Sequence, residues 1–206
     1  MLLQQLTLGC LCLRYNVSEP NEHDFSDLFN DIAHSACKDN ISSVAYKNDS
    51  VIAIVLNTIK QYSDVDYIPK IDLNTDFADE IERGEYKSHK ENQIVTFLNA
   101  IEQHQFDLLG KDVKLFKVEI ICVSDQARGL GIAKELMRRS FEAAHSEKCS
   151  WMAATCTAVA SQTLFAKLGF NTFFEMPFEK YRENGKIVFN NPPDNGKSAK
   201  FMAIRL

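Results

Sequence analysis

The stretch VKLFKVEIICVSDQARGLGIA, residues 113–133, decides the fold. Its first half, Val113–Val123, is the strongest strand pattern in the chain, because apolar and β-branched residues fill it. A loop with two glycines follows, and residues 132–145 then repeat apolar side chains at helical spacing. The pattern predicts a buried strand, a tight loop and an amphipathic helix in direct succession.

The junction between this strand and this helix has the features of an anion site. The first backbone N–H groups of a helix have no partner within the helix, and the helix dipole makes that end positive. Gly129 and Gly131 remove side chains, so that an anion can approach the backbone, and Arg128 adds a positive charge. The sequence therefore predicts a cradle for a pyrophosphate.

Two common phosphate-binding motifs do not fit this loop. A dinucleotide-binding fold requires G-x-G-x-x-G, and Lys134 stands where the third glycine belongs. A Walker loop requires G-x-x-x-x-G-K-[ST], and the chain does not contain that pattern. The missing residues therefore disfavour both of these motifs.

Further strands and helices are expected around this unit. Apolar residues at helical spacing predict helices at 24–36, 89–106 and 159–168. Strands are expected at 41–46 and 51–56, which form a hairpin, and at 149–155, 170–178 and 198–204, while 61–84 reads as a long polar loop. Strands interleaved with helices predict an α/β (α+β) fold with a mixed sheet, in a single domain spanning residues 1–206.

The composition limits the partners and the compartment. A net charge of -5 lacks the basic excess of a nucleic-acid-binding surface. Residues 1–13 are apolar, but they are too short for a membrane span and lack the basic start of a signal peptide. None of the six cysteines forms a C-x-x-C pair. We expect a cytoplasmic protein with free thiols, no metal site, and neither nucleic acid nor membrane as a partner.

Two motifs, taken together, resemble a known superfamily. Gln126–Ala133 looks like the Q/R-x-x-G-x-G/A signature of the GCN5-related N-acetyltransferases (GNAT), and Thr157–Phe170 is similar to the helix and Leu-Gly-Phe strand entry of that superfamily. The motifs occur in the order of the superfamily. The resemblance covers residues 41–206, whereas residues 1–20 are atypical. It implies an acyl-CoA N-acyltransferase fold, in which a splayed mixed sheet is flanked by helices.

The resemblance also implies the co-substrate and the residues that hold it. Acetyl-CoA would donate its acetyl group directly to an amine in a ternary complex, without a metal. The backbone of the strand end would pair with the pantetheine arm, and the loop would hold the pyrophosphate. By resemblance, the cofactor-binding residues are Ile121, Cys122, Val123, Gln126, Arg128, Gly129, Leu130, Gly131, Ile132 and Ala133.

A narrower resemblance suggests where the catalytic groups lie. Thr157 and Ser161 look like the two serines of the insect-type arylalkylamine N-acetyltransferase branch, and their spacing would put them on one helical face. Phe165 stands where many other members carry a tyrosine acid. That branch also has a glutamate in a Glu-Pro-Leu context, for which Glu19 is the nearest match. Independently, Glu119 in the middle of an apolar strand is a candidate base.

We therefore expect an N-acetyltransferase that acts on a small primary amine, with arylalkylamines as the preferred class. Two alternatives stay open at this point. The acceptor could be a polyamine or a protein lysine, or the chain could bind coenzyme A without catalysing transfer. The protein is expected to act as a monomer or homodimer.

Overall fold

A six-stranded mixed sheet forms the centre of the molecule. The computed structural model describes residues 25–62, 70–110 and 112–206. The strands lie in the order β1-β2-β3-β4-β8-β5; β3 and β4 run parallel, and the other neighbours in the sheet are antiparallel. Their bounds are β1 Ser43–Lys47, β2 Ser50–Gln61, β3 Lys114–Val123, β4 Trp151–Cys156, β5 Asn171–Pro177 and β8 Ser198–Arg205. The predicted mixed sheet is confirmed.

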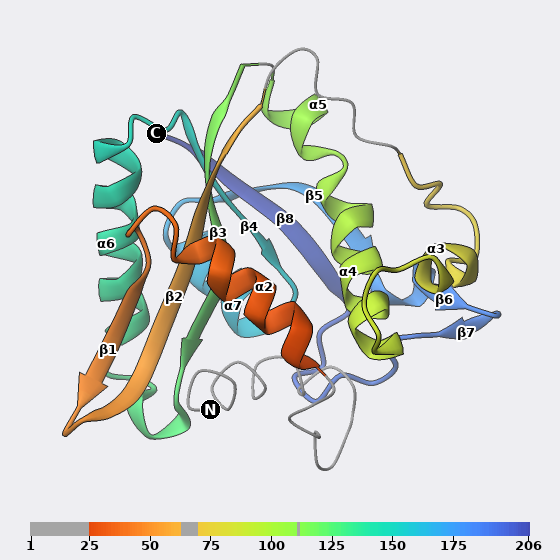
Figure 1. The fold of residues 1–206 in the computed structure, drawn as a ribbon, viewed down its shortest axis with the longest axis horizontal. Helices are drawn as coiled ribbons and strands as arrows, with labels where there is room; N and C mark the ends of the chain where they lie inside the picture. Colours follow the sequence, from red (N-terminus) through yellow and green to blue (C-terminus); the bar gives the residue numbers. More distant parts are fainter. Residues whose placement is uncertain (1–24, 63–69, 111) are drawn as a thin grey trace.

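Helices cover both faces of this sheet. In Figure 1, α2 (Ser26–Ala36) and α4 (His89–Glu102) lie in front of the strands, and α7 (Val159–Lys167) lies behind them. The long helix α6 (Ile132–Ser146) packs against β1, β2 and β3. The remaining short elements are α3 Ala78–Glu82, α5 Gln105–Leu109, the 3-10 turns η2 Asp125–Ala127 and η3 Phe178–Lys180, and the hairpin β6 Arg182–Glu183 with β7 Lys186–Ile187.

Each face of the sheet has its own apolar core. Phe97 and Ile101 of α4 pack with Leu115 and Phe201 on the front face. On the other face, Leu136 and Met137 of α6 and Phe165 of α7 pack with Phe116, Met152 and Met202. Because alternate residues of a strand point to opposite faces, the run Leu115–Val118 contributes to both cores. The strand is buried on both sides, which explains its near-continuous apolar sequence.

The sheet is splayed at its centre. β3 and β4 pair over four positions, from Leu115 with Trp151 to Val118 with Ala154. Beyond this point the described strands no longer pair with each other, although β3 still pairs with β2 up to Val123 and β4 still pairs with β8. Toward the carboxyl ends of both strands, β3 and β4 thus continue side by side without pairing to each other, and we call this part of their boundary the slot.

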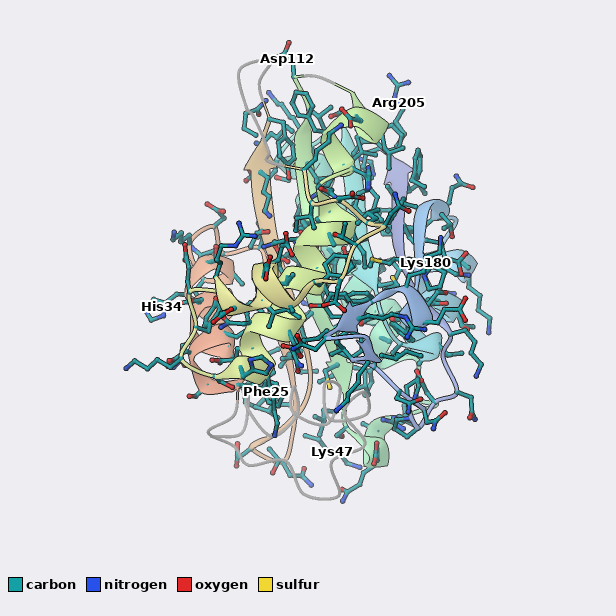
Figure 2. The ribbon with its side chains drawn as sticks, turned by 90° about the vertical axis from the view of Figure 1, so that its right-hand side faces the viewer. Phe25, His34, Lys47, Asp112, Lys180 and Arg205 are labelled. Carbon is teal, nitrogen blue, oxygen red and sulfur yellow. The ribbon has the colours of Figure 1, made fainter. Side chains whose placement is uncertain are left out.

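The slot lies at one end of the sheet. Val123, at its mouth, pairs with Ala53 near the start of β2. The hairpin turn that precedes β2 is at this same end, where Figure 2 labels Lys47. Asp112, just before β3, lies at the opposite end of the molecule (Figure 2). The loop that follows β3 and the end of the sheet where β3 begins are thus well separated.

Several element boundaries differ from the sequence prediction. The second hairpin strand continues to Gln61 instead of ending at residue 56. Its polar residues have partners on both faces of the sheet, because Asn57 donates to Ser140 of α6 and Thr58 donates to Glu119. The predicted loop at 61–84 contains α3, and residues 63–69 lie outside the described part. The helix predicted at 89–106 breaks after Glu102 into α4 and α5.

The other helices and the hairpin are confirmed. The hairpin turn consists of Asn48 and Asp49, which both have positive φ angles, as a tight two-residue turn requires. The small hairpin of β6 and β7 was not predicted. No helix within the described residues is long and apolar enough to cross a membrane.

Candidate functional site

The loop after β3, residues 124–131, is held at its start by backbone hydrogen bonds, and we call it the glycine loop. Ser124 donates its N–H to the carbonyl of Ile52 on β2, at 2.8 Å. The η2 turn then brings the N–H of Ala127 within 2.9 Å of the carbonyl of Ser124, and Ala127 is buried. The loop therefore starts from a fixed position at the mouth of the slot and delivers the chain to the first turn of α6.

Both glycines of the loop are required by their backbone conformation. Gly129 and Gly131 each have a φ of +77°, a value that side chains strongly disfavour. A Cβ atom built on either residue would meet no atom within 4 Å, so the space above the loop is open. The prediction that these glycines leave room for a ligand agrees with this geometry.

The start of α6 presents unpaired amides to this open space. The first helical hydrogen bond runs from the N–H of Glu135 to the carbonyl of Gly131, at 3.1 Å, and no side chain caps the helix. A helix N-terminus of this kind attracts anions through its N–H groups and its dipole. The donors and the space fit a pyrophosphate group.

Arg128 already has an acidic partner. Its guanidinium lies 2.7 Å from a carboxylate oxygen of Asp125, and both side chains are mostly exposed. An exposed ion pair of this kind is weak, typically about 0–1 kcal/mol. The arginine can therefore exchange Asp125 for a stronger anion at low cost.

A chain of polar side chains crosses the front face of the sheet where the slot begins. Glu119 accepts a hydrogen bond from Thr58 of β2 and an ion pair from Lys117, both at 2.7 Å. Lys117 also lies 2.7 Å from Glu102 of α4, whose other carboxylate oxygen accepts a hydrogen bond from Thr155 of β4 at 2.8 Å. We call Thr58, Glu119, Lys117, Glu102 and Thr155 the polar bridge.

The charges in the polar bridge are stabilised by each other. Burial disfavours the charged form of Lys117, but Glu102 and Glu119 hold the pKa of Lys117 above its usual value. Burial likewise opposes the charge on Glu102, and Lys117 and Lys60 nevertheless keep the pKa of Glu102 below its usual value. Burial and the neighbouring Lys117 lower the pKa of Lys60. The Lys117–Glu102 pair is therefore ionised.

This network changes the interpretation of Glu119. The side chain lies at the slot, as a catalytic group should, and is 16% exposed. However, each of its carboxylate oxygens already has a donor, so it is not the isolated, desolvated carboxylate that the sequence suggested. Its unused lone pairs still allow it to accept a further hydrogen bond from an ammonium group.

The structure corrects the expected placement of Thr157 and Ser161. Thr157 precedes α7, whose N-cap residue is Ala158, so the two residues do not lie one helical turn apart on the same helix. Thr157 is buried, and the hydroxyl of Ser161 donates to the carbonyl of Ala158 at 2.8 Å. Both residues still lie at the junction that follows β4, on the other side of the slot from the glycine loop.

Other expected residues are distributed around this site. Cys122 is buried, Ile121 and Val123 are half-buried at the edge of the slot, and Leu130 is 66% exposed beside the loop. Phe165 is a core residue that packs edge-to-face on Phe170. Gln126 is exposed, and Ile132 and Ala133 open α6. Glu19 lies outside the described residues.

The sequence analysis did not place Lys117, Glu102 or the two threonines of the polar bridge in the site. One signal was available: in the strand 113–123, Lys117 and Glu119 alternate with apolar residues and so point to one face. The partner on α4 could not be found in this way, because nothing local connects Glu102 with the strand.

Comparison with known proteins finds a matching family model and similar solved structures. A sequence model of the acetyltransferase (GNAT) domain matches residues 86–172, which include β3, the glycine loop, α6, β4 and α7. A solved structure of arylalkylamine N-acetyltransferase 2 from Aedes aegypti is 29% identical, with 87% of this chain and 79% of that chain covered and a TM-score of 0.64. Residues 86–172 thus match the acetyltransferase domain of the GNAT superfamily, to which the sequence motifs also point.

Two further structures share the fold of this chain. Arylalkylamine N-acetyltransferase like 5b from mosquito is 19% identical over 81% of this chain and 74% of that chain, with a TM-score of 0.62. Polyamine N-acetyltransferase from Drosophila melanogaster is 16% identical over 98% and 95% of the two chains, with a TM-score of 0.66. The resemblance to the superfamily and to its insect arylalkylamine branch is confirmed.

Proposed function

We propose that this GNAT chain transfers the acetyl group of acetyl-CoA directly to a small primary amine, with arylalkylamines as the preferred acceptors. The amine nitrogen attacks the thioester carbonyl, the carbon–sulfur bond breaks, and an amide and coenzyme A are formed. The nitrogen must lose a proton, and the departing thiolate must gain one. A single observation carries the proposal: the slot between β3 and β4 opens directly onto the glycine loop.

The co-substrate would bind along this slot and loop. The backbone of Ile121, Cys122 and Val123 forms an edge that β4 does not cover, so it can pair with the amide groups of a pantetheine arm. The amides from Gly129 to Ala133 would hold the pyrophosphate, with Arg128 as a counter-charge. Gln126 and Leu130, at the surface of the loop, would flank the pantetheine arm.

The acceptor would meet the thioester where the strands part. Glu119 offers its free lone pairs to the ammonium group there and would orient it for proton loss. Thr157 and Ser161, on the β4 side, are candidates for passing a proton to the thiolate. A backbone N–H at the slot would stabilise the developing oxyanion. Glu19 remains a sequence-based candidate for the base.

The preferred acceptor class rests on relatives. The Aedes aegypti protein with 29% identity is an arylalkylamine N-acetyltransferase, and the Drosophila enzyme at 16% identity acts on polyamines and forms N-acetylagmatine. An amine panel separates these classes: dopamine, tyramine and serotonin against agmatine, spermidine and a lysine peptide. Release of the coenzyme A thiol is the readout. Negligible turnover of every arylalkylamine beside clear turnover of another amine would overturn the preferred class.

Binding of the co-substrate is tested with Gly129→Glu. The substitution puts negative charge and bulk where the phosphates would lie, so we expect coenzyme A binding measured by calorimetry to be lost. Gly185→Glu is the matched control, because Gly185 has a φ of +76° and equally open surroundings far from the loop. Unchanged affinity in Gly129→Glu would refute this placement of the co-substrate.

One observation favours a second candidate function, binding of coenzyme A without transfer. Both carboxylate oxygens of Glu119 are already engaged, and this weakens the case for it as a free base. Saturable coenzyme A binding, with no thiol release for any amine of the panel between pH 6 and pH 9, would select this candidate over the enzyme.

A further inference from the structure

The polar bridge is continuous from one side of the slot to the other. Four contacts of 2.7 to 2.8 Å connect Thr58 of β2, Glu119 and Lys117 of β3, Glu102 of α4 and Thr155 of β4. Among these residues, Lys117 and Thr58 are almost fully buried. The bridge therefore joins three strands and a helix through side chains alone.

The bridge lies at the level where the slot begins. Lys117 pairs with Ala153, and the last paired position, Val118 with Ala154, is one residue further along. Glu119 and Thr155 are the next residues on the two strands, and like Lys117 they point to the face that α4 covers. The bridge thus forms the inner end of the slot on this face.

The opposite face offers no alternative space at this level. The side chains of Val118, Ala154 and Phe165 pack together there in the second core, and each is at most 3% exposed. A group that enters the slot from the glycine loop therefore ends against ionised and hydrogen-bonded side chains on one face and against a packed core on the other.

We infer that the polar bridge makes this protein selective for short acyl groups, with Lys117 and Glu102 as the residues that determine acyl-chain length. This rests on the proposed function, in which the thioester lies in the slot. A two-carbon acyl group would end before the bridge. Each added methylene would be forced against the Lys117–Glu102 ion pair, which would lose hydration or hydrogen bonds without an apolar surface in return.

The first test is binding of a thioester series to the wild-type protein. Calorimetry is run with coenzyme A, acetyl-CoA, butyryl-CoA and hexanoyl-CoA. We expect affinity to fall at least about tenfold from acetyl-CoA to hexanoyl-CoA, whereas an apolar pocket would strengthen binding about three- to fourfold with each methylene. Equal or rising affinity along the series would overturn the inference. Failure of coenzyme A itself to bind would instead overturn the proposed function.

The second test removes the ion pair. Lys117→Met/Glu102→Met deletes both charges of this pair together, because removal of Lys117 alone would leave Glu102 buried without this partner. Glu119 also loses Lys117 in this variant, but it is 16% exposed and keeps the hydrogen bond from Thr58. We expect the ratio of hexanoyl-CoA to acetyl-CoA affinity to rise at least about tenfold over wild type. An unchanged ratio would contradict the assignment, since a purely structural role would weaken both ligands alike.

A matched pair on the same strand is the control. Lys114 lies 3.2 Å from Glu147 at the far end of β3, away from the slot. Lys114→Met/Glu147→Met should keep the wild-type ratio. The wild-type series decides the inference by itself if the Lys117 variant does not fold.

Discussion

At the scale of single residues, the exposed carboxylate of Asp125 is expected to weaken coenzyme A binding. Asp125 holds Arg128 at 2.7 Å, and its carboxylate lies on the same loop that would receive a diphosphate. We predict that Asp125→Asn tightens coenzyme A binding about two- to fivefold, because the change removes a like charge and frees the arginine. Titration calorimetry at low salt measures the effect, which should shrink as ionic strength rises.

Glu142→Gln is the matched control for this prediction. Glu142 pairs with Arg138 on the exposed face of α6, beyond the first turn of the helix. Both substitutions remove one exposed carboxylate that pairs with an arginine, so both change the net charge equally. If the two variants bind coenzyme A equally well, the effect of Asp125 is one of net charge, and the local competition for Arg128 is refuted.

At the scale of elements, Glu91 links two helices on the front face of the sheet. It lies in the first turn of α4 and is 1% exposed. Its carboxylate accepts the N–H of Leu28 at 2.8 Å, and so caps the start of α2, which has no cap of its own. We predict that Glu91→Ala lowers the free energy of unfolding by about 1–2 kcal/mol. Urea unfolding of Glu91→Ala beside the exposed control Glu82→Ala measures it, and equal stability of the two variants would exclude the cap.

The same carboxylate gives a pH dependence with a definite sign. Burial raises the pKa of Glu91, against the helix amides that favour its charged form. A raised folded-state pKa stabilises the fold below the unfolded value, about 4.3, and this contribution is lost as pH rises through the folded value. Glu91→Gln cannot titrate. We therefore predict that the stability of this variant relative to wild type increases from pH 4 to pH 7 in urea unfolding, and a constant difference would contradict the shift.

The boundary between α4 and α5 shows what sequence alone cannot reveal about elements. Apolar spacing continues to residue 106, yet the helix breaks at Gln103, whose side-chain amide exchanges hydrogen bonds with the backbone N–H and carbonyl of Ile71 at 2.6 and 3.1 Å. Such a contact depends on a segment 32 residues away. By contrast, the loop at Gly129 and Gly131 was predictable, because its chemistry is local to the chain. The polar bridge was not, since Glu102 meets Lys117 only in the folded protein.

At the scale of the whole molecule, the sheet consists of two antiparallel halves. β1, β2 and β3 form one half, and β4, β8 and β5 form the other. They pair directly over only four positions, from Leu115 with Trp151 to Val118 with Ala154. The rest of the boundary is the slot, so a ligand that pairs with its edges would complete the sheet and join the two halves.

This arrangement predicts where a bound ligand restricts motion. With coenzyme A at one hundred times its Kd, the liganded state gains about 2.7 kcal/mol over any opened state that cannot bind. Hydrogen exchange followed by mass spectrometry should then slow most in residues 119–123, which border the slot on the side away from β2, and in residues 129–134, which lead into and open α6. Residues 171–177 at the far edge of the sheet should change least. Gly129→Glu should show no protection at the same ligand concentration. Protection centred on α3 and α4 would instead place the ligand outside the slot, and the two halves would then be joined only by their four paired positions.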